Sequence, residues 1–213
     1  MKKERIDVFL AKRGLLDYYI KARKYLYLPP PDQILCFIDP KLEGSSVRGY
    51  TYYHYKMDRT PQEIWYIGFQ NDPPEITTLL HELIHVAGGC EITAHNYVGI
   101  LRYAIENDLP PFPLLMLPDL KLEEIEKALA KLGINSIDEY YDIKGIIPPT
   151  HELQNTQNGL KIARKEGVDE RMLVEVFLIE LSSALDYPEY NPLETKIIEA
   201  LAETLKKKFQ KTS

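Results

Sequence analysis

The first third of the chain combines a helical pattern with strand-like runs. Residues 3–26 carry apolar side chains at helical spacing, interrupted near Gly14, and the prolines at 29–31 end this segment. Three later runs are rich in isoleucine and aromatic residues and are expected to be strands: 34–38, 50–55 and 64–69. Short turn-like stretches separate these runs, so the simplest expected arrangement is an antiparallel meander.

Beyond the strands the pattern is helical. One helix is expected to begin at Asp72, a good N-cap residue that is followed by Pro73, and to end at Gly88-Gly89. The other expected helices are 91–107, 121–132, 136–142, 152–166, 169–186 and 192–210. The predicted fold class is therefore α+β, with a small, mostly antiparallel sheet followed by a helical C-terminal half.

A proline-rich stretch at 109–118 interrupts the helical pattern and marks the expected domain boundary. The predicted organisation is an α+β core at 1–118 and a helical lobe at 119–213, either as two units or as one continuous domain. At 213 residues the chain is long enough for either arrangement.

Composition narrows the class of protein. Hydrophobic residues make up 45% of the chain and charged residues 27%, as in soluble globular proteins. The net charge of −6 argues against a nucleic-acid partner. No apolar run suggests a signal peptide or a membrane span, so we expect a cytoplasmic protein without a membrane partner. The 15 tyrosines and the many lysine, glutamate and isoleucine residues are typical of thermophilic proteins.

The stretch LLHELIHVAGGCEITAHN, at 79–96, carries the candidate chemistry. His81 and His85 are four residues apart and lie about 40° apart around a helix, so that both rings can bind one zinc ion. Glu82 lies about 100° from His81 on the same helix, where it can act as general base toward water activated by the metal. A solvated helix face would carry the same pattern, and this alternative stays open.

A third ligand must come from outside this helix. Glu91 follows His85 by six residues, just after the two glycines, and His95 lies one helical turn further on. We predict that Glu91 is the ligand and keep His95 as the alternative. The residue that does not bind the metal would orient a ligand or contact the substrate.

The segment HELIHVAGGCE resembles the active-site segment of zincin metallopeptidases. His81, Glu82, His85, Gly88 and Glu91 match the metzincin spacing H-E-x-x-H-x-x-G-x-x-H/D, except that glutamate occupies the last position. A glutamate ligand from the next helix is similar to gluzincins, which have a longer spacing. The resemblance covers residues 64–107 and implies a sheet whose edge strand, here 64–69, binds an extended peptide beside the zinc helix.

The sequence thus predicts a zinc-dependent hydrolase, most simply a metallopeptidase that acts on a peptide or protein substrate. Zn²⁺ is the expected cofactor, with His81, His85 and Glu91 as ligands and Glu82 as the general base. The alternative is a non-catalytic metal-binding or protein-interaction protein that retains the same helix. The sequence leaves the substrate and the oligomeric state open.

Overall fold

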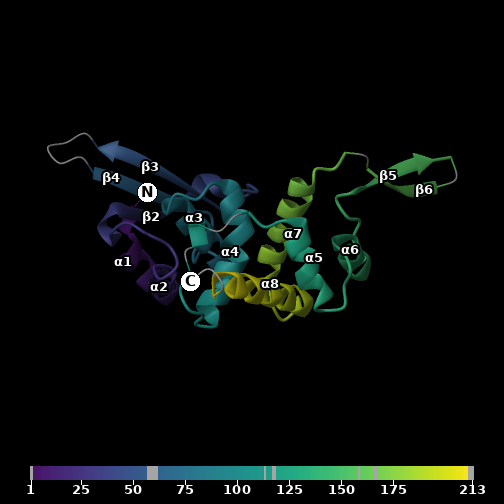
Figure 1. Cartoon of the computed structure of the whole chain (residues 1–213). Coiled ribbons are helices and arrows are strands. Elements are labelled where there is room, and N and C mark those ends of the chain that lie inside the picture. The colour runs from purple at the N-terminus through teal and green to yellow at the C-terminus, as the bar shows by residue number, and fades with distance from the viewer. Residues whose placement is uncertain are drawn as a thin grey trace. The chain divides into compact units, whose positions relative to one another are not determined.

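The computed structural model describes residues 2–56, 62–112, 114–116, 119–157, 159–165 and 167–210. The chain divides into two compact units, Met1–Leu117 and Pro118–Ser213 (Figure 1). The fold is α+β, as expected, with its larger sheet in the first unit. Within the described residues, no helix has both the length and the apolar character needed to cross a membrane.

The sheet of the first unit has four strands in the order β1-β2-β4-β3: β1 (Glu4–Arg5), β2 (Ile34–Ile38), β3 (Gly49–Lys56) and β4 (Gln62–Phe69). The pairs β1·β2 and β3·β4 are antiparallel, whereas β2 and β4 are parallel. The expected meander is therefore wrong. The two most apolar runs, β2 and β4, take the central positions, and the tyrosine-rich β3 takes the edge, where its side chains stay partly exposed.

The α-helices among the described residues of this unit are α1 (Ile6–Ala11), α2 (Leu16–Ala22), α3 (Ile76–Val86) and α4 (Glu91–Glu106). Gly14, with φ of 71°, separates α1 from α2. Helix α3 ends where the sequence predicts, since Gly88 adopts φ of 97°. Its start is later than expected, with Glu75 as the N-cap residue. The carboxylate of Asp72 instead accepts two hydrogen bonds from Arg13, at 2.6 and 3.0 Å.

The core of the first unit lies between the sheet and these helices. Leu79, Leu80, Leu83 and Ile84 of α3 are fully buried, and the Phe9 ring stacks on Phe69 at 5.7 Å between centroids. Helices α3 and α4 pack against each other, and α3 also contacts β3. The edge strand and the helix with the two histidines are therefore neighbours.

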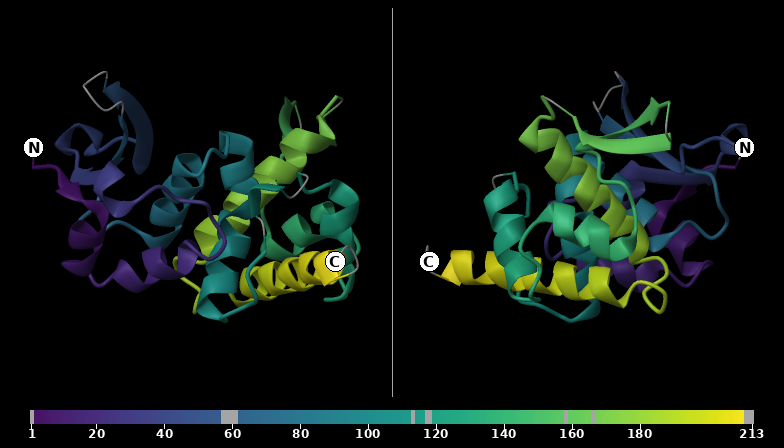
Figure 2. Two further views of the ribbon diagram at one scale, coloured as in Figure 1. Left: turned by 60° about the vertical axis from the view of Figure 1, so that its left-hand side comes forward. Right: turned by 90° about the vertical axis from the view of Figure 1, so that its right-hand side faces the viewer.

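In the second unit the described residues form helices and a hairpin: α5 (Leu122–Ala130), α6 (Ile137–Lys144), β5 (His151–Thr156), β6 (Gly159–Arg164), α7 (Glu170–Ala184) and α8 (Pro192–Gln210). The prediction of a helix at 152–166 is wrong, because this stretch forms the antiparallel pair β5·β6. The sequence carries Asn158-Gly159 there, a dipeptide that favours hairpin turns over helix. The hairpin and α8 lie on opposite sides of this unit (Figure 2).

Candidate metal centre

Helix α3 supplies two of the candidate ligands. His81 and His85 are one turn apart on this helix, and their Nε2 atoms are 3.1 Å apart. Nδ1 of His85 lies 3.0 Å from the carbonyl oxygen of Gly89. Because a carbonyl oxygen can only accept a hydrogen bond, Nδ1 carries the proton, and in the neutral ring Nε2 is the nitrogen with the lone pair. This is the tautomer that a metal requires.

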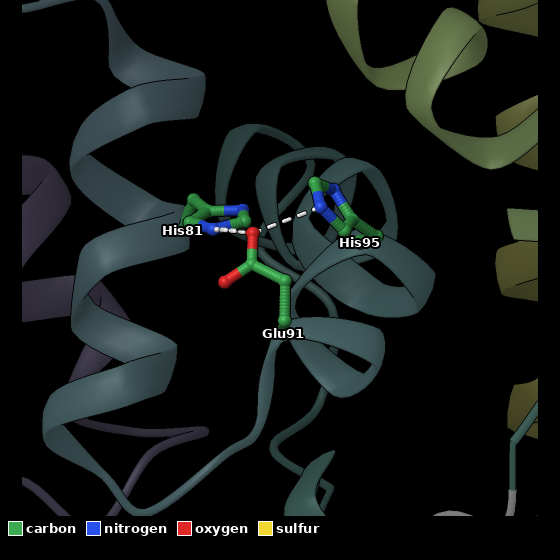
Figure 3. A group of neighbouring side chains, drawn as sticks. All are labelled: His81, Glu91 and His95. Carbon is green, nitrogen blue, oxygen red and sulfur yellow. Dashed lines mark ion pairs between the residues drawn. The ribbon is translucent and has the colours of Figure 1, made fainter. Parts of the chain in front are cut away.

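Helix α4 supplies the other two candidate ligands. Glu91 is its first residue and His95 lies one turn later. Oε1 of Glu91 is 2.9 Å from Nε2 of His95 and 3.3 Å from Nε2 of His81. Figure 3 shows the two imidazoles approaching this oxygen from either side. The other carboxylate oxygen, Oε2, is 3.0 Å from Nε2 of His85.

Burial controls the protonation of His81. Loss of hydration lowers the pKa of its imidazole to about 4, although the nearby Glu91 carboxylate opposes the shift. The ring is therefore neutral at pH 7. A neutral imidazole is the form that binds a metal ion, because its unprotonated nitrogen can donate a lone pair.

Three of these side chains fit a metal ion in both chemistry and spacing. The ligand atoms of His81, Glu91 and His95 all lie within 4.8 Å of one another, which makes them a possible metal-binding group. His85 contacts the same carboxylate. Ligands of a tetrahedral zinc ion, each about 2.0–2.1 Å from the metal, are about 3.3 Å apart. The contacts of 2.9 to 3.3 Å in this cluster are close to that spacing.

Glu82 points to the sheet instead of joining the cluster. Its side chain is 4% exposed, and its Oε2 accepts a hydrogen bond of 2.6 Å from the Thr51 hydroxyl on β3. Burial raises the pKa of the Glu82 carboxyl to about 7, although the Thr51 hydrogen bond opposes the shift. Gly49 leaves room for this arrangement, since a Cβ there would lie 3.0 Å from Oε1 of Glu82.

A cleft of about 610 Å³ lies between β3 and α3. Its β-strand wall consists of Gly49–Tyr53 of β3 and Trp65 of β4, and its helical wall includes His81, Glu82 and His85. Glu91 and the two glycines before Cys90 also line it, whereas His95 is not among the described residues that do. The metal-ligand candidates from α3, Glu91 and the candidate base Glu82 therefore face one space.

The structure brings all of the sequence-predicted site residues into one region. His81, His85, Glu91 and His95 make direct contacts, and Glu82 lies in the adjoining wall. The prediction that 64–69 is the edge strand beside the site is wrong, because 64–69 is an inner strand and β3 forms the edge. Gly49 and Thr51 were missed. The two residues are two positions apart on a strand, so both side chains lie on the same face. This face contacts Glu82 only because β3 packs against α3.

Compared with known proteins, the chain matches no family model, no curated protein and no solved structure.

Proposed function

We propose that this protein is a zinc-dependent hydrolase that cleaves peptide bonds, with His81, His85 and Glu91 as metal ligands and Glu82 as general base. One observation carries the proposal. The candidate metal ligands and a buried carboxylate face the same cleft, and the opposite wall of that cleft is a sheet edge. A bound zinc ion supplies Lewis-acid polarisation and activation of water.

Glu82 is suited to take a proton at neutral pH. Its raised pKa lies close to the operating pH, where a general base is most efficient and can also return the proton to a leaving amine. The hydrogen bond from Thr51 fixes one carboxylate oxygen and thereby orients the other. Glu82 could thus perform both proton transfers of amide hydrolysis, from the water and to the leaving amine.

Strand β3 is suited to bind an extended chain. It pairs with β4 on one side and has no strand partner on the other side within the described part of the sheet. A peptide that adds to this edge would form main-chain hydrogen bonds and lie along the cleft. The substrate class that fits is therefore an unfolded or flexible peptide segment.

A second candidate is a non-catalytic metal protein. The specific observation in its favour is that three imidazoles contact the Glu91 carboxylate, which makes four protein donors, the number that closes a structural zinc site. In that case the metal would join α3 to α4 and Glu82 would serve only the packing against β3.

Glu82→Gln separates the two candidates. For a hydrolase, we expect the variant to retain its zinc and to lose about 100-fold or more in turnover, because glutamine cannot accept the proton. The measurement is a peptide-library digest together with elemental analysis of both proteins. Glu123→Gln, which changes an exposed glutamate of α5, is the matched control. Equal cleavage by parent and Glu82→Gln would contradict the proposal, and zinc without any cleavage would favour the structural candidate.

A further inference from the structure

The cluster contains one more nitrogen donor than the proposed ligand set uses. Nε2 of His95 contacts the same oxygen of Glu91 as Nε2 of His81 does. The His81 and His95 rings are 4.9 Å apart between centroids. Nε2 of His95 and Nε2 of His81 thus meet at one oxygen of Glu91, and Nε2 of His85 lies 3.0 Å from the other oxygen of the same carboxylate.

The four donors differ in exposure. The side chains of His81, His85 and His95 are 17%, 19% and 22% exposed, whereas that of Glu91 is 62% exposed. Glu91 also lines the cleft, and His95 does not. The three imidazoles therefore form an inner set held by the packing of α3 on α4, and Glu91 is the donor that can turn out toward the cleft.

We propose that His81, His85 and His95 are the permanent metal ligands and that Glu91 is an exchangeable fourth ligand. The inference rests on the proposed function, since it concerns the metal of that site. At rest the carboxylate closes the set. When an oxygen donor from the cleft, such as a water molecule or a substrate carbonyl, takes its place, the Glu91 side chain is released and no proton or electron needs to move. A glutamate suits this role because its carboxylate binds zinc and its flexible side chain allows the carboxylate to move away.

An exchangeable Glu91 explains how a site with four protein donors could still catalyse hydrolysis. A catalytic zinc site keeps three protein ligands and one exchangeable position, whereas a structural site has four fixed ligands. Here the exchangeable position would lie on the cleft side, next to Glu82. Glu91 would then occupy this position until water or a substrate oxygen from the cleft replaces it.

The test uses the full chain loaded with Co²⁺, whose visible absorption reports the coordination sphere. His95→Gln is expected to lower metal affinity by about 10-fold or more, measured by competition with a chelator. Glu91→Gln is expected to keep its metal and to bind azide at least about 10-fold more tightly than the parent, because the competing carboxylate is gone. His54→Gln, at an exposed histidine of β3, is the matched control and should change neither quantity.

Two results would overturn the inference. One is unchanged metal affinity in His95→Gln, and the other is equal azide binding by the parent and Glu91→Gln. X-ray absorption of the zinc-loaded parent needs no variant, and it should count three imidazoles; two would also overturn the inference. If two are found and Glu82→Gln still abolishes cleavage, only this inference fails. If three are found and the parent cleaves nothing, only the hydrolase proposal fails.

Discussion

At the scale of single residues, the chemistry of Glu82 depends on two residues of β3. Thr51 donates to its carboxylate, and Gly49 lacks the Cβ that would approach it. The same missing Cβ would also lie 2.8 Å from Cγ2 of Thr78, one turn before Glu82 on α3. The buried Glu82 carboxylate is therefore held in a socket, by which we mean the close contact of β3, at Gly49 and Thr51, with α3.

Thr51→Val tests this socket. Valine has nearly the shape of threonine but cannot donate, so one oxygen of the buried Glu82 carboxylate loses its partner. We expect the free energy of unfolding to fall by about 1–3 kcal/mol. Turnover on any peptide that the parent cuts should fall about 10-fold or more, with metal content unchanged. Urea denaturation, metal analysis and peptide digestion measure the three quantities.

Thr51→Ser is the control, because serine keeps the hydroxyl and loses only a methyl group. A serine variant as impaired as the valine variant would show that the methyl contacts of Thr51 matter, and not its hydrogen bond to Glu82.

At the scale of elements, the short connection between α3 and α4 brings the four candidate ligands together. Helix α3 ends at Val86 and α4 begins at Glu91. The carbonyl of Gly89, in this connection, accepts a hydrogen bond from Nδ1–H of His85. A Cβ on Gly89 would lie 2.5 Å from Cγ2 of Ile84 and 3.0 Å from its carbonyl oxygen. The turn thus sets both the approach of the helices and the tautomer of one ligand.

Gly89→Ala is expected to disturb both functions of this turn. The added methyl group must push the connection away from Ile84, at a cost of about 1–3 kcal/mol in the free energy of unfolding. The shift of the Gly89 carbonyl should also weaken metal binding by about 10-fold. Denaturation and chelator competition measure these effects. Glu123→Gln, at an exposed position of α5, is the control and should change stability by less than about 0.5 kcal/mol.

In the second unit, the Ser136 side chain caps the start of α6. The Ser136 hydroxyl accepts a hydrogen bond of 3.1 Å from the backbone N–H of Glu139. Ser136→Ala should lower the stability of this unit by about 1 kcal/mol, and Ser136→Asp should retain it. Urea denaturation followed by circular dichroism gives the values. Equal stability of the alanine and aspartate variants would contradict the capping role.

At the scale of the whole molecule, all candidate metal ligands belong to the first compact unit. A metal that binds only the folded state stabilises it by about 4 kcal/mol when its free concentration is 1,000 times the Kd. Because the ligands come from α3 and α4, this stabilisation acts on the packing of these two helices. The second unit contributes no described residue to the cluster.

Removal of the metal should therefore affect one unit only. On addition of a chelator to the full chain, we expect amide hydrogen exchange to accelerate at 76–106 and to stay unchanged at 122–144 and 170–205. Mass spectrometry of the digested protein measures both regions at once. His81→Ala should not respond to the chelator, because it has already lost a ligand. Equal acceleration in both units would refute the assignment of the metal to the first.

Much of the candidate site could be predicted from the sequence because its determinants are local. The spacing of His81 and His85 fixes their separation on a helix whatever the rest of the chain does. The glycines at 88 and 89 end that helix, and Glu91 and His95 follow at a spacing of one turn. The helices α4, α7 and α8 were also predicted close to their observed bounds, since each shows helical spacing of apolar residues over several turns.

Only the tertiary structure decided how these local features meet. The order of the strands depends on which runs are buried on both faces, so 64–69 lies inside the sheet and β3 beside the cleft. The contact of Thr51 with Glu82 joins residues 31 positions apart. Asp72 pairs with Arg13, 59 positions away, instead of capping α3. Such contacts depend on the packing of the whole unit, and helix or strand periodicity carries no information about them, because it reports only which face of an element is apolar.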